Sequence, residues 1–184
     1  MNKTVIKCGL SVDEIDKAIK EIEKFKEDFR KKVDTYRKRI AEEVRASAQL
    51  NFGNSIVDDV IGTIVDGKVV KGVTSRKADV TVDVDERGSI LVVVAHGEDA
   101  VWCEFGSGVY HNGSVGSSPH PRGDKLGFKI GSYGKGHGKQ EVWGYKDEKG
   151  EIVITHGTPA TMPMYNAAME VKRKAVAIAR EVFG

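Results

Sequence analysis

The longest regular pattern in the chain is a heptad-like repeat in SVDEIDKAIKEIEKFKEDFRKKVDTYRKRI, residues 11–40. Apolar side chains recur every seven residues, and a second apolar series lies between them. The first series is Ile15, Ile22, Phe29 and Tyr36, and the second is Ile19, Val33 and Ile40, with Lys26 interrupting it. The pattern predicts one long amphipathic helix that begins at a capping box, Ser11 to Glu14, and continues to about Leu50.

Such a helix would be ~60 Å long at 1.5 Å per residue, which is more than one domain of 184 residues can cover. Two alternatives follow and stay open. The helix bends, or forms a helix hairpin, on the chain's own sheet; or its first half projects and packs on another chain. For the second alternative the candidate interface residues are Ile15, Ile19, Ile22, Phe29 and Val33.

Beyond the helix, the pattern changes to strands. Asn51-Phe52-Gly53-Asn54 is expected to end the helix, and residues 55–65 fit either a short helix or an irregular strand. Residues 80–84 alternate apolar and polar side chains, and after the turn at Glu86-Arg87-Gly88 the run SILVVVA (89–95) is apolar on both faces. This predicts an antiparallel hairpin with a central second strand.

The C-terminal third adds two strands and a helix. The segments QEVWGY (140–145) and EIVIT (151–155) flank a turn containing Lys149-Gly150. The last helix is expected to be capped by Thr161, with Pro163 in its first turn. We therefore expect an α+β fold: a mainly antiparallel sheet of about four strands, packed by the C-terminal helix and the long N-terminal helix.

Two units and one long loop follow from this organisation. Residues 1–50 form the long helix, a possible oligomerisation arm, and residues 51–184 form the α+β domain. Within that domain, residues 106–138 are rich in glycine and poor in aliphatic side chains, which predicts a flexible extended loop.

The composition is typical of a globular protein, and the cysteines do not indicate the disulfide framework of a small secreted protein. The chain is 40% hydrophobic and 30% charged with a net charge of +2, and its two cysteines, Cys8 and Cys103, belong to no CxxC motif. The N-terminus MNKTVIKCGLS lacks the ~7–15-residue apolar region of a signal peptide, and no apolar run approaches ~18 residues, so we expect no signal peptide, no membrane span and no membrane partner. Lys and Arg exceed Asp and Glu by 13 to 10 in residues 1–50 and by 7 to 4 in 106–150, whereas acidic residues lead by 10 to 5 in 51–105. This alternation suits head-to-tail self-association.

The sequence departs from known catalytic and phosphate-binding motifs at specific residues. The nucleophile elbow needs G-x-S-x-G, but the glycines at 106 and 108 are adjacent to Ser107. In GSYGKGHGKQ (131–140), His137 stands where a P-loop needs lysine. His96-Gly97-Glu98 matches the H-x-E of zinc deaminases, but the P-C-x-x-C motif that supplies their remaining zinc ligands is missing. We expect no cofactor.

Two further site hypotheses remain as alternatives. A metal-binding enzyme would use Cys103 and Glu104 together with the histidines His96, His111, His120, His137 and His156, although exposed loop histidines are the simpler interpretation. A nucleic-acid contact would use the basic loop 122–139, whose cations are Arg122, Lys125, Lys129, Lys135 and Lys139. For Glu104 we favour a structural role, accepting hydrogen bonds from the amides of the glycine-rich turn that follows it. Val101 or Trp102 is expected to anchor this region in the core.

Two motifs in order carry a resemblance to a known family. The first is AVWCEFGSG (100–108), in which Ala100, Glu104, Phe105, Gly106 and Gly108 match, with Ser107 in place of threonine. The second is GTPATMPMYNAA (157–168), in which Gly157, Ala160, Pro163, Met164 and Ala167 or Ala168 match, with Met164 where phenylalanine is usual. Together they resemble the gene-ten-like tail-component family of long-tailed bacteriophages and prophages, over roughly residues 35–184.

The resemblance implies a structural virion protein without catalytic residues. Such a protein would act in head–tail joining or tail completion, forming a homo-oligomeric ring that contacts connector, neck and tail proteins. Its expected location is the neck or tail of the virion, after assembly in the cytoplasm of the bacterial host. DNA contact is the less favoured alternative. Residues 106–108 would be the hinge from which the loop extends.

Overall fold

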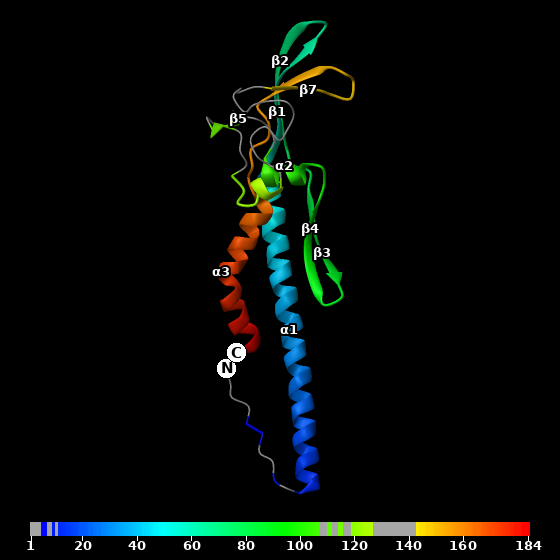
Figure 1. Ribbon diagram of the computed structural model, residues 1–184, viewed down its shortest axis with the longest axis vertical. Coiled ribbons are helices and arrows are strands. Elements are labelled where there is room, and N and C mark those ends of the chain that lie inside the picture. Colours follow the sequence, from blue (N-terminus) through cyan, green and yellow to red (C-terminus); the bar gives the residue numbers. More distant parts are fainter. Residues whose placement is uncertain are drawn as a thin grey trace.

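The computed structural model describes residues 5–6, 9, 11–106, 110–111, 114–115, 119–126 and 143–184. It shows an α+β fold in which a long N-terminal helix, α1 (Val12–Asn54), is joined by antiparallel sheets and a C-terminal helix, α3 (Pro163–Phe183). The molecule is elongated. One sheet lies at one end, and the N-terminal half of α1 extends to the other (Figure 1).

Both ends of α1 follow from side-chain hydrogen bonds. At its start the predicted capping box is confirmed: the Glu14 amide donates to Ser11 Oγ, and the Ser11 amide donates to the Glu14 carboxylate, each at 3.4 Å. At its end α1 continues through Asn54, the last residue of the segment predicted to end it and four residues beyond the expected Leu50. Phe52 is fully buried and the Asn51 side chain donates to the Pro163 carbonyl at 3.2 Å, and these tertiary contacts keep the last turn helical.

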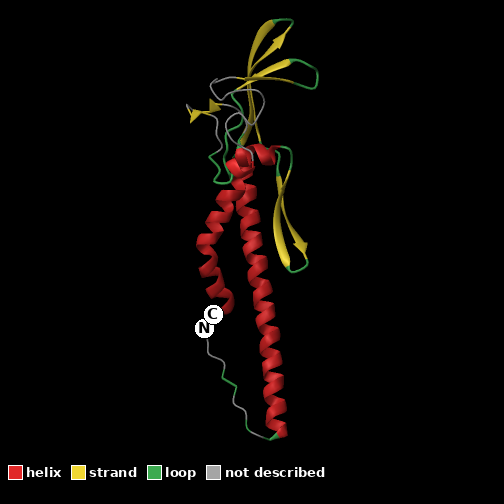
Figure 2. Ribbon diagram, viewed as in Figure 1, coloured by secondary structure: helices red, strands yellow, loops and turns green. Residues whose placement is uncertain are grey.

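The two halves of α1 have different surroundings. From about Val33 onward it packs along α3 and along a hairpin formed by β3 (Thr81–Arg87) and β4 (Ile90–His96). Most of the first half projects beyond these elements as a straight rod (Figure 2), and α3 reaches it at Phe29, whose ring lies 5.8 Å from the Phe183 ring. The C-terminal half therefore packs along a helix of its own chain, as in the helix-hairpin alternative, and the N-terminal half projects. That the projecting half packs on another chain stays a prediction.

The largest sheet is antiparallel, in the strand order β2-β1-β8-β7. Its strands are β1 (Ile56–Val65), β2 (Lys68–Lys77), β7 (Trp143–Lys146) and β8 (Ile152–Thr155). The ambiguous segment after α1 is thus a strand, and the two C-terminal strands and their turn are confirmed. Asp147 Oδ1 accepts hydrogen bonds from the amides of Lys149 and Glu151, both at 2.9 Å, which closes that turn.

The β3–β4 hairpin forms a separate two-stranded sheet, so the prediction that residues 89–95 form a central strand is wrong. Within the described residues β4 pairs only with β3. Its apolar run is explained by α1, against which the hairpin packs, rather than by a second neighbouring strand. Two short strands, β5 (Tyr110–His111) and β6 (Ser114–Val115), pair with each other, and a 3-10 turn, η1, spans Asp124–Leu126.

The buried core lies at the junction between the helices and the sheets. It is formed by one cluster from α1, β1, the β3 region, α3 and the short helix α2 (Asp99–Phe105): Ala48, Phe52, Val57, Val80, Val82, Ala100, Cys103 and Ala167. Ala100 and Cys103 belong to the first motif of the resemblance, so the described part of that motif lies in this core.

Candidate functional site

Glu104 on α2 caps α3 across 60 residues of sequence. Its carboxylate accepts hydrogen bonds from the Met164 amide at 2.8 Å and the Tyr165 amide at 2.9 Å. The first amides of a helix have no partner within the helix, and a negative charge there is favoured by the helix dipole. The N-cap residue of α3, Met162, makes no side-chain capping bond, and Glu104 takes this role although Thr161 was predicted to do so.

His120 completes the same cluster and is buried, which corrects its interpretation as an exposed loop histidine. Its Nε2 lies 3.1 Å from the Glu104 carboxylate, and its Nδ1 accepts a hydrogen bond from the Arg122 amide at 3.0 Å. Because Nδ1 accepts, the ring proton is on Nε2 and is donated to Glu104. The ring also contacts Phe105 and Tyr165, with centroids 4.6 and 5.3 Å away. The segment 119–126 is thereby fastened to α2 and α3.

The backbone reinforces this contact. The Cys103 carbonyl accepts hydrogen bonds from the amides of Thr161 at 2.9 Å and Met162 at 3.1 Å. Gly106 has φ +80°, and a β-carbon there would lie 3.1 Å from the Ala160 amide nitrogen, so only glycine fits this close approach. The two motifs therefore meet in space and form one unit, which we call the motif junction: residues 103–106, 120 and 160–165.

Two expectations about the first motif are corrected by this geometry. Glu104 was expected to hold the amides of the following glycine-rich turn, but it holds those of α3. Val101 was a candidate anchor, but it is 45% exposed and Trp102 is only half-buried, whereas Ala100 and Cys103 are the buried residues of α2. Ser107 and Gly108 lie outside the described residues, as does most of the loop 106–138.

The polar groups of the motif junction are occupied by contacts within the chain. Burial, and secondarily the nearby Asp99, raise the pKa of the Cys103 thiol to about 11, so it remains a thiol at neutral pH rather than a nucleophilic thiolate. Both oxygens of Glu104 and both ring nitrogens of His120 are engaged in the contacts above. Gly157 and Pro163 are buried, and Met164 packs against the core.

A second buried carboxylate, Asp99 at the start of α2, was not singled out by its sequence. It accepts two hydrogen bonds from the Arg76 guanidinium, at 2.6 and 2.9 Å, and one from the Asp79 amide at 2.9 Å. Burial raises the pKa of the Asp99 carboxyl, but these hydrogen bonds and the charge of Arg76 outweigh it and hold the pKa below its ordinary value of 3.8. The group links β2, the start of β3 and α2.

Replacing Asp99 by asparagine is expected to lower the free energy of unfolding by about 1 kcal/mol at pH 7, because Arg76 is half exposed and its pairing is screened. A lowered native pKa adds stability above the unfolded-state pKa, and this stability is lost as the pH falls through the native value. Urea midpoints at pH 7 and pH 3 should therefore differ more for the wild type than for Asp99→Asn. An equal difference would show that Asp99 does not contribute to acid sensitivity.

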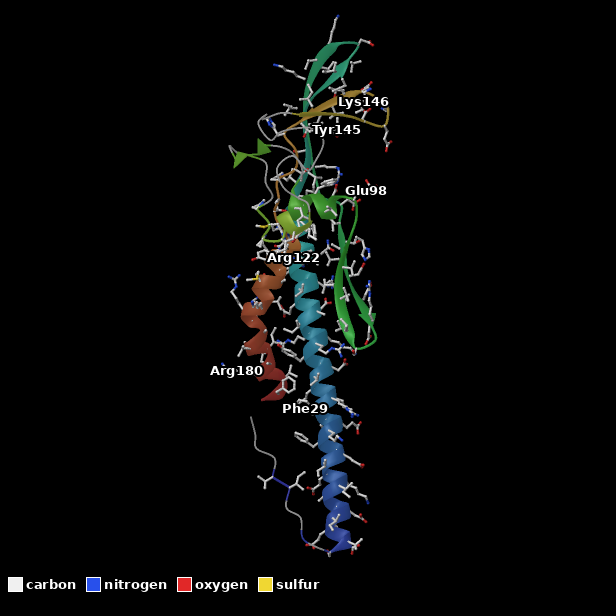
Figure 3. All side chains as sticks on the ribbon, in the orientation of Figure 1. Phe29, Glu98, Arg122, Tyr145, Lys146 and Arg180 are labelled. Carbon is white, nitrogen blue, oxygen red and sulfur yellow. The ribbon has the colours of Figure 1, made fainter. Side chains whose placement is uncertain are left out.

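The predicted interface residues lie in three places: on α1, on the segment 119–126, and outside the described residues. Ile15, Ile19, Ile22 and Phe29 are exposed, between 41% and 48%, whereas Val33 is half-buried. Arg122 and Lys125 are exposed on the segment 119–126 (Arg122 is labelled in Figure 3). Lys129, Lys135 and Lys139, together with His137, lie outside the described residues.

The candidate metal ligands are not brought together where the structure describes them. In that part of the chain, no three His, Cys, Asp or Glu side chains are close enough to share a metal ion. His96 is exposed, and its Nε2 lies 3.9 Å from the Asp83 carboxylate. The described helices include none with the length and hydropathy required to cross a bilayer.

An open apolar groove of about 520 Å³ lies between α1, α3 and the β3–β4 hairpin. Its walls include Ile40 and Val44 of α1, Leu91 of β4, and Val171 of α3. Comparisons with protein families, with curated proteins and with solved structures found no match for this chain.

Proposed function

We propose that this chain is a non-enzymatic structural component of a long-tailed bacteriophage or prophage particle, acting in head–tail joining or tail completion. It self-associates and contacts connector and tail proteins. The observation that carries the proposal is the motif junction: the two motifs on which the resemblance rests are joined by Glu104, which holds the first turn of α3. A shared structural joint explains why both motifs occur in one chain.

The arrangement of α1 supports an assembly role. The body of the molecule buries the C-terminal half of α1, while the N-terminal half presents large apolar side chains to solvent. An exposed apolar stripe of this kind is typical of a surface that contacts another chain. Its loss should therefore affect assembly more than folding.

The test is deletion of the gene from the phage or prophage that encodes it, followed by electron microscopy of the particles. We expect separate filled heads and tails, with joined particles restored by the wild-type gene supplied in trans. Ile19→Glu/Ile22→Glu should fail to restore them, whereas Val176→Glu, a change at an exposed site on α3, should restore them.

Normal joined particles after deletion would contradict the proposal. A purified protein that binds DNA at low salt, with affinity falling steeply as salt rises, would instead favour the nucleic-acid alternative.

A further inference from the structure

The N-terminal half of α1 carries an apolar stripe whose large side chains are exposed, while the small Ala18 is buried and Phe29, at the end of the stripe, also contacts Phe183 of α3. We call residues 12–32 the projecting segment. Its large apolar side chains lie on one face at heptad-like spacing and are 41–50% exposed: Ile15, Ile19, Ile22, Phe25 and Phe29. From Ile15 to Phe29 the stripe is about 21 Å long at 1.5 Å per residue. Figure 3 places Phe29 near the end of α3, where the stripe begins to leave the body.

The charges of the projecting segment are arranged with opposite sign in its two halves. Residues 12–23 contain five acidic and two basic side chains, a net charge of −3. Residues 24–32 contain two acidic and five basic side chains, a net charge of +3. A helix with this distribution is complementary to a reversed copy of itself, whereas a parallel copy would place like charge beside like charge.

We infer that the projecting segment pairs with the same segment of a second copy of this chain in antiparallel orientation. Aligning the stripes places Ile22 against Ile22 at the two-fold axis, with Ile15 of each copy near Phe29 of the other. The same register brings Asp13 and Glu14 towards Arg30 and Lys31 of the other copy. Apolar contact and charge therefore select the same orientation.

The pair is closed by its own symmetry. A two-fold contact uses one patch on both copies, so it yields a dimer and no further growth through that surface. The bodies then lie at opposite ends of the paired helices, and any ring must be built through other surfaces. This inference rests on the self-association in the proposed function, but not on a place in the virion.

Disulfide cross-linking of variants that each carry one introduced cysteine tests the orientation. The background is Cys8→Ser, with Cys103 retained because its thiol is buried and its pKa is raised. Ile22→Cys should form a covalent dimer under mild oxidation, roughly tenfold faster than Val176→Cys on the exposed side of α3, because pairing raises the effective thiol concentration. Ile15→Cys alone should not form a covalent dimer. In this register residue 15 of one copy lies opposite residue 29 of the other, and this offset of 14 residues places the two thiols about 21 Å apart.

A mixture gives the second arm of the test. Ile15→Cys mixed with Phe29→Cys should cross-link as fast as Ile22→Cys, although each alone does not. Circular dichroism confirms that each variant is folded, which matters for Phe29 because its ring lies 5.8 Å from the Phe183 ring.

Each outcome has one meaning. Fast cross-linking of Ile15→Cys alone would show a parallel pair and overturn the inference. Association by sedimentation without cross-linking at Ile22 would also overturn it, and would point to another surface such as the apolar groove. A wild-type chain that sediments as a monomer would contradict the proposed self-association itself.

Discussion

Replacing Glu104 by alanine is expected to lower the free energy of unfolding by about 3 kcal/mol, because the change removes a buried cap and leaves several donors without acceptors. The amides of Met164 and Tyr165 and the Nε2 proton of His120 all lose their carboxylate. The cost should appear as a lower urea midpoint and a lower melting temperature, with α3 loosened from α2.

Two controls separate capping from general damage to α2. Glu104→Gln keeps one carbonyl oxygen and a similar volume, so its loss of stability should be about half that of alanine. Glu98→Ala removes an exposed glutamate whose side chain makes no capping bond to the same helix, and it should leave stability unchanged. If Glu104→Ala unfolded like the wild type, Glu104 would not be the element that joins the two motifs.

Local structure was predictable from the sequence where a short pattern carries its own physical cause. The reciprocal bonds of Ser11 and Glu14 form within one helical turn, so the start of α1 could be located from four residues. The hairpin of residues 81–96 and the turn at Lys149-Gly150 follow in the same way from alternation and from a glycine with positive φ. The α+β class rests on these local elements.

Contacts between distant residues had no such signal. Glu104 and the amides it caps are 60 residues apart, and nothing near Thr161 indicates that another helix will supply the cap. The burial of His120 and the pairing of Asp99 with Arg76 depend on the same tertiary arrangement. The sequence therefore predicted correctly that Glu104 accepts hydrogen bonds, but the predicted donors were wrong.

The heptad-like pattern of α1 shows which face is apolar but not which half is covered. Coverage is set by the length of α3, whose last aromatic residue, Phe183, contacts Phe29 and Tyr36. Beyond that point the large apolar side chains of α1 are exposed, although the small Ala18 is buried. One continuous stripe in the sequence therefore serves as core in one half and as exposed surface in the other.

The double variant Ile19→Glu/Ile22→Glu is expected to weaken self-association by at least about 100-fold. Each of these half-exposed side chains contributes about 1 kcal/mol when covered, and a symmetric pair contains four of them. Stability of the body should change by less than about 0.5 kcal/mol, because both residues are exposed and distant from the buried core. Phe29→Glu is less suitable, since it would also disturb Phe183.

The central claim is that the projecting half of α1 is a surface for assembly and not a displaced part of the core. Sedimentation equilibrium of the wild type and of Ile19→Glu/Ile22→Glu, each with a thermal melt at a low and a high protein concentration, tests it most directly. We expect an associating wild type and a folded, monomeric variant, with Val176→Glu associating as the wild type does. A monomeric wild type, or a double variant that unfolds, would contradict it.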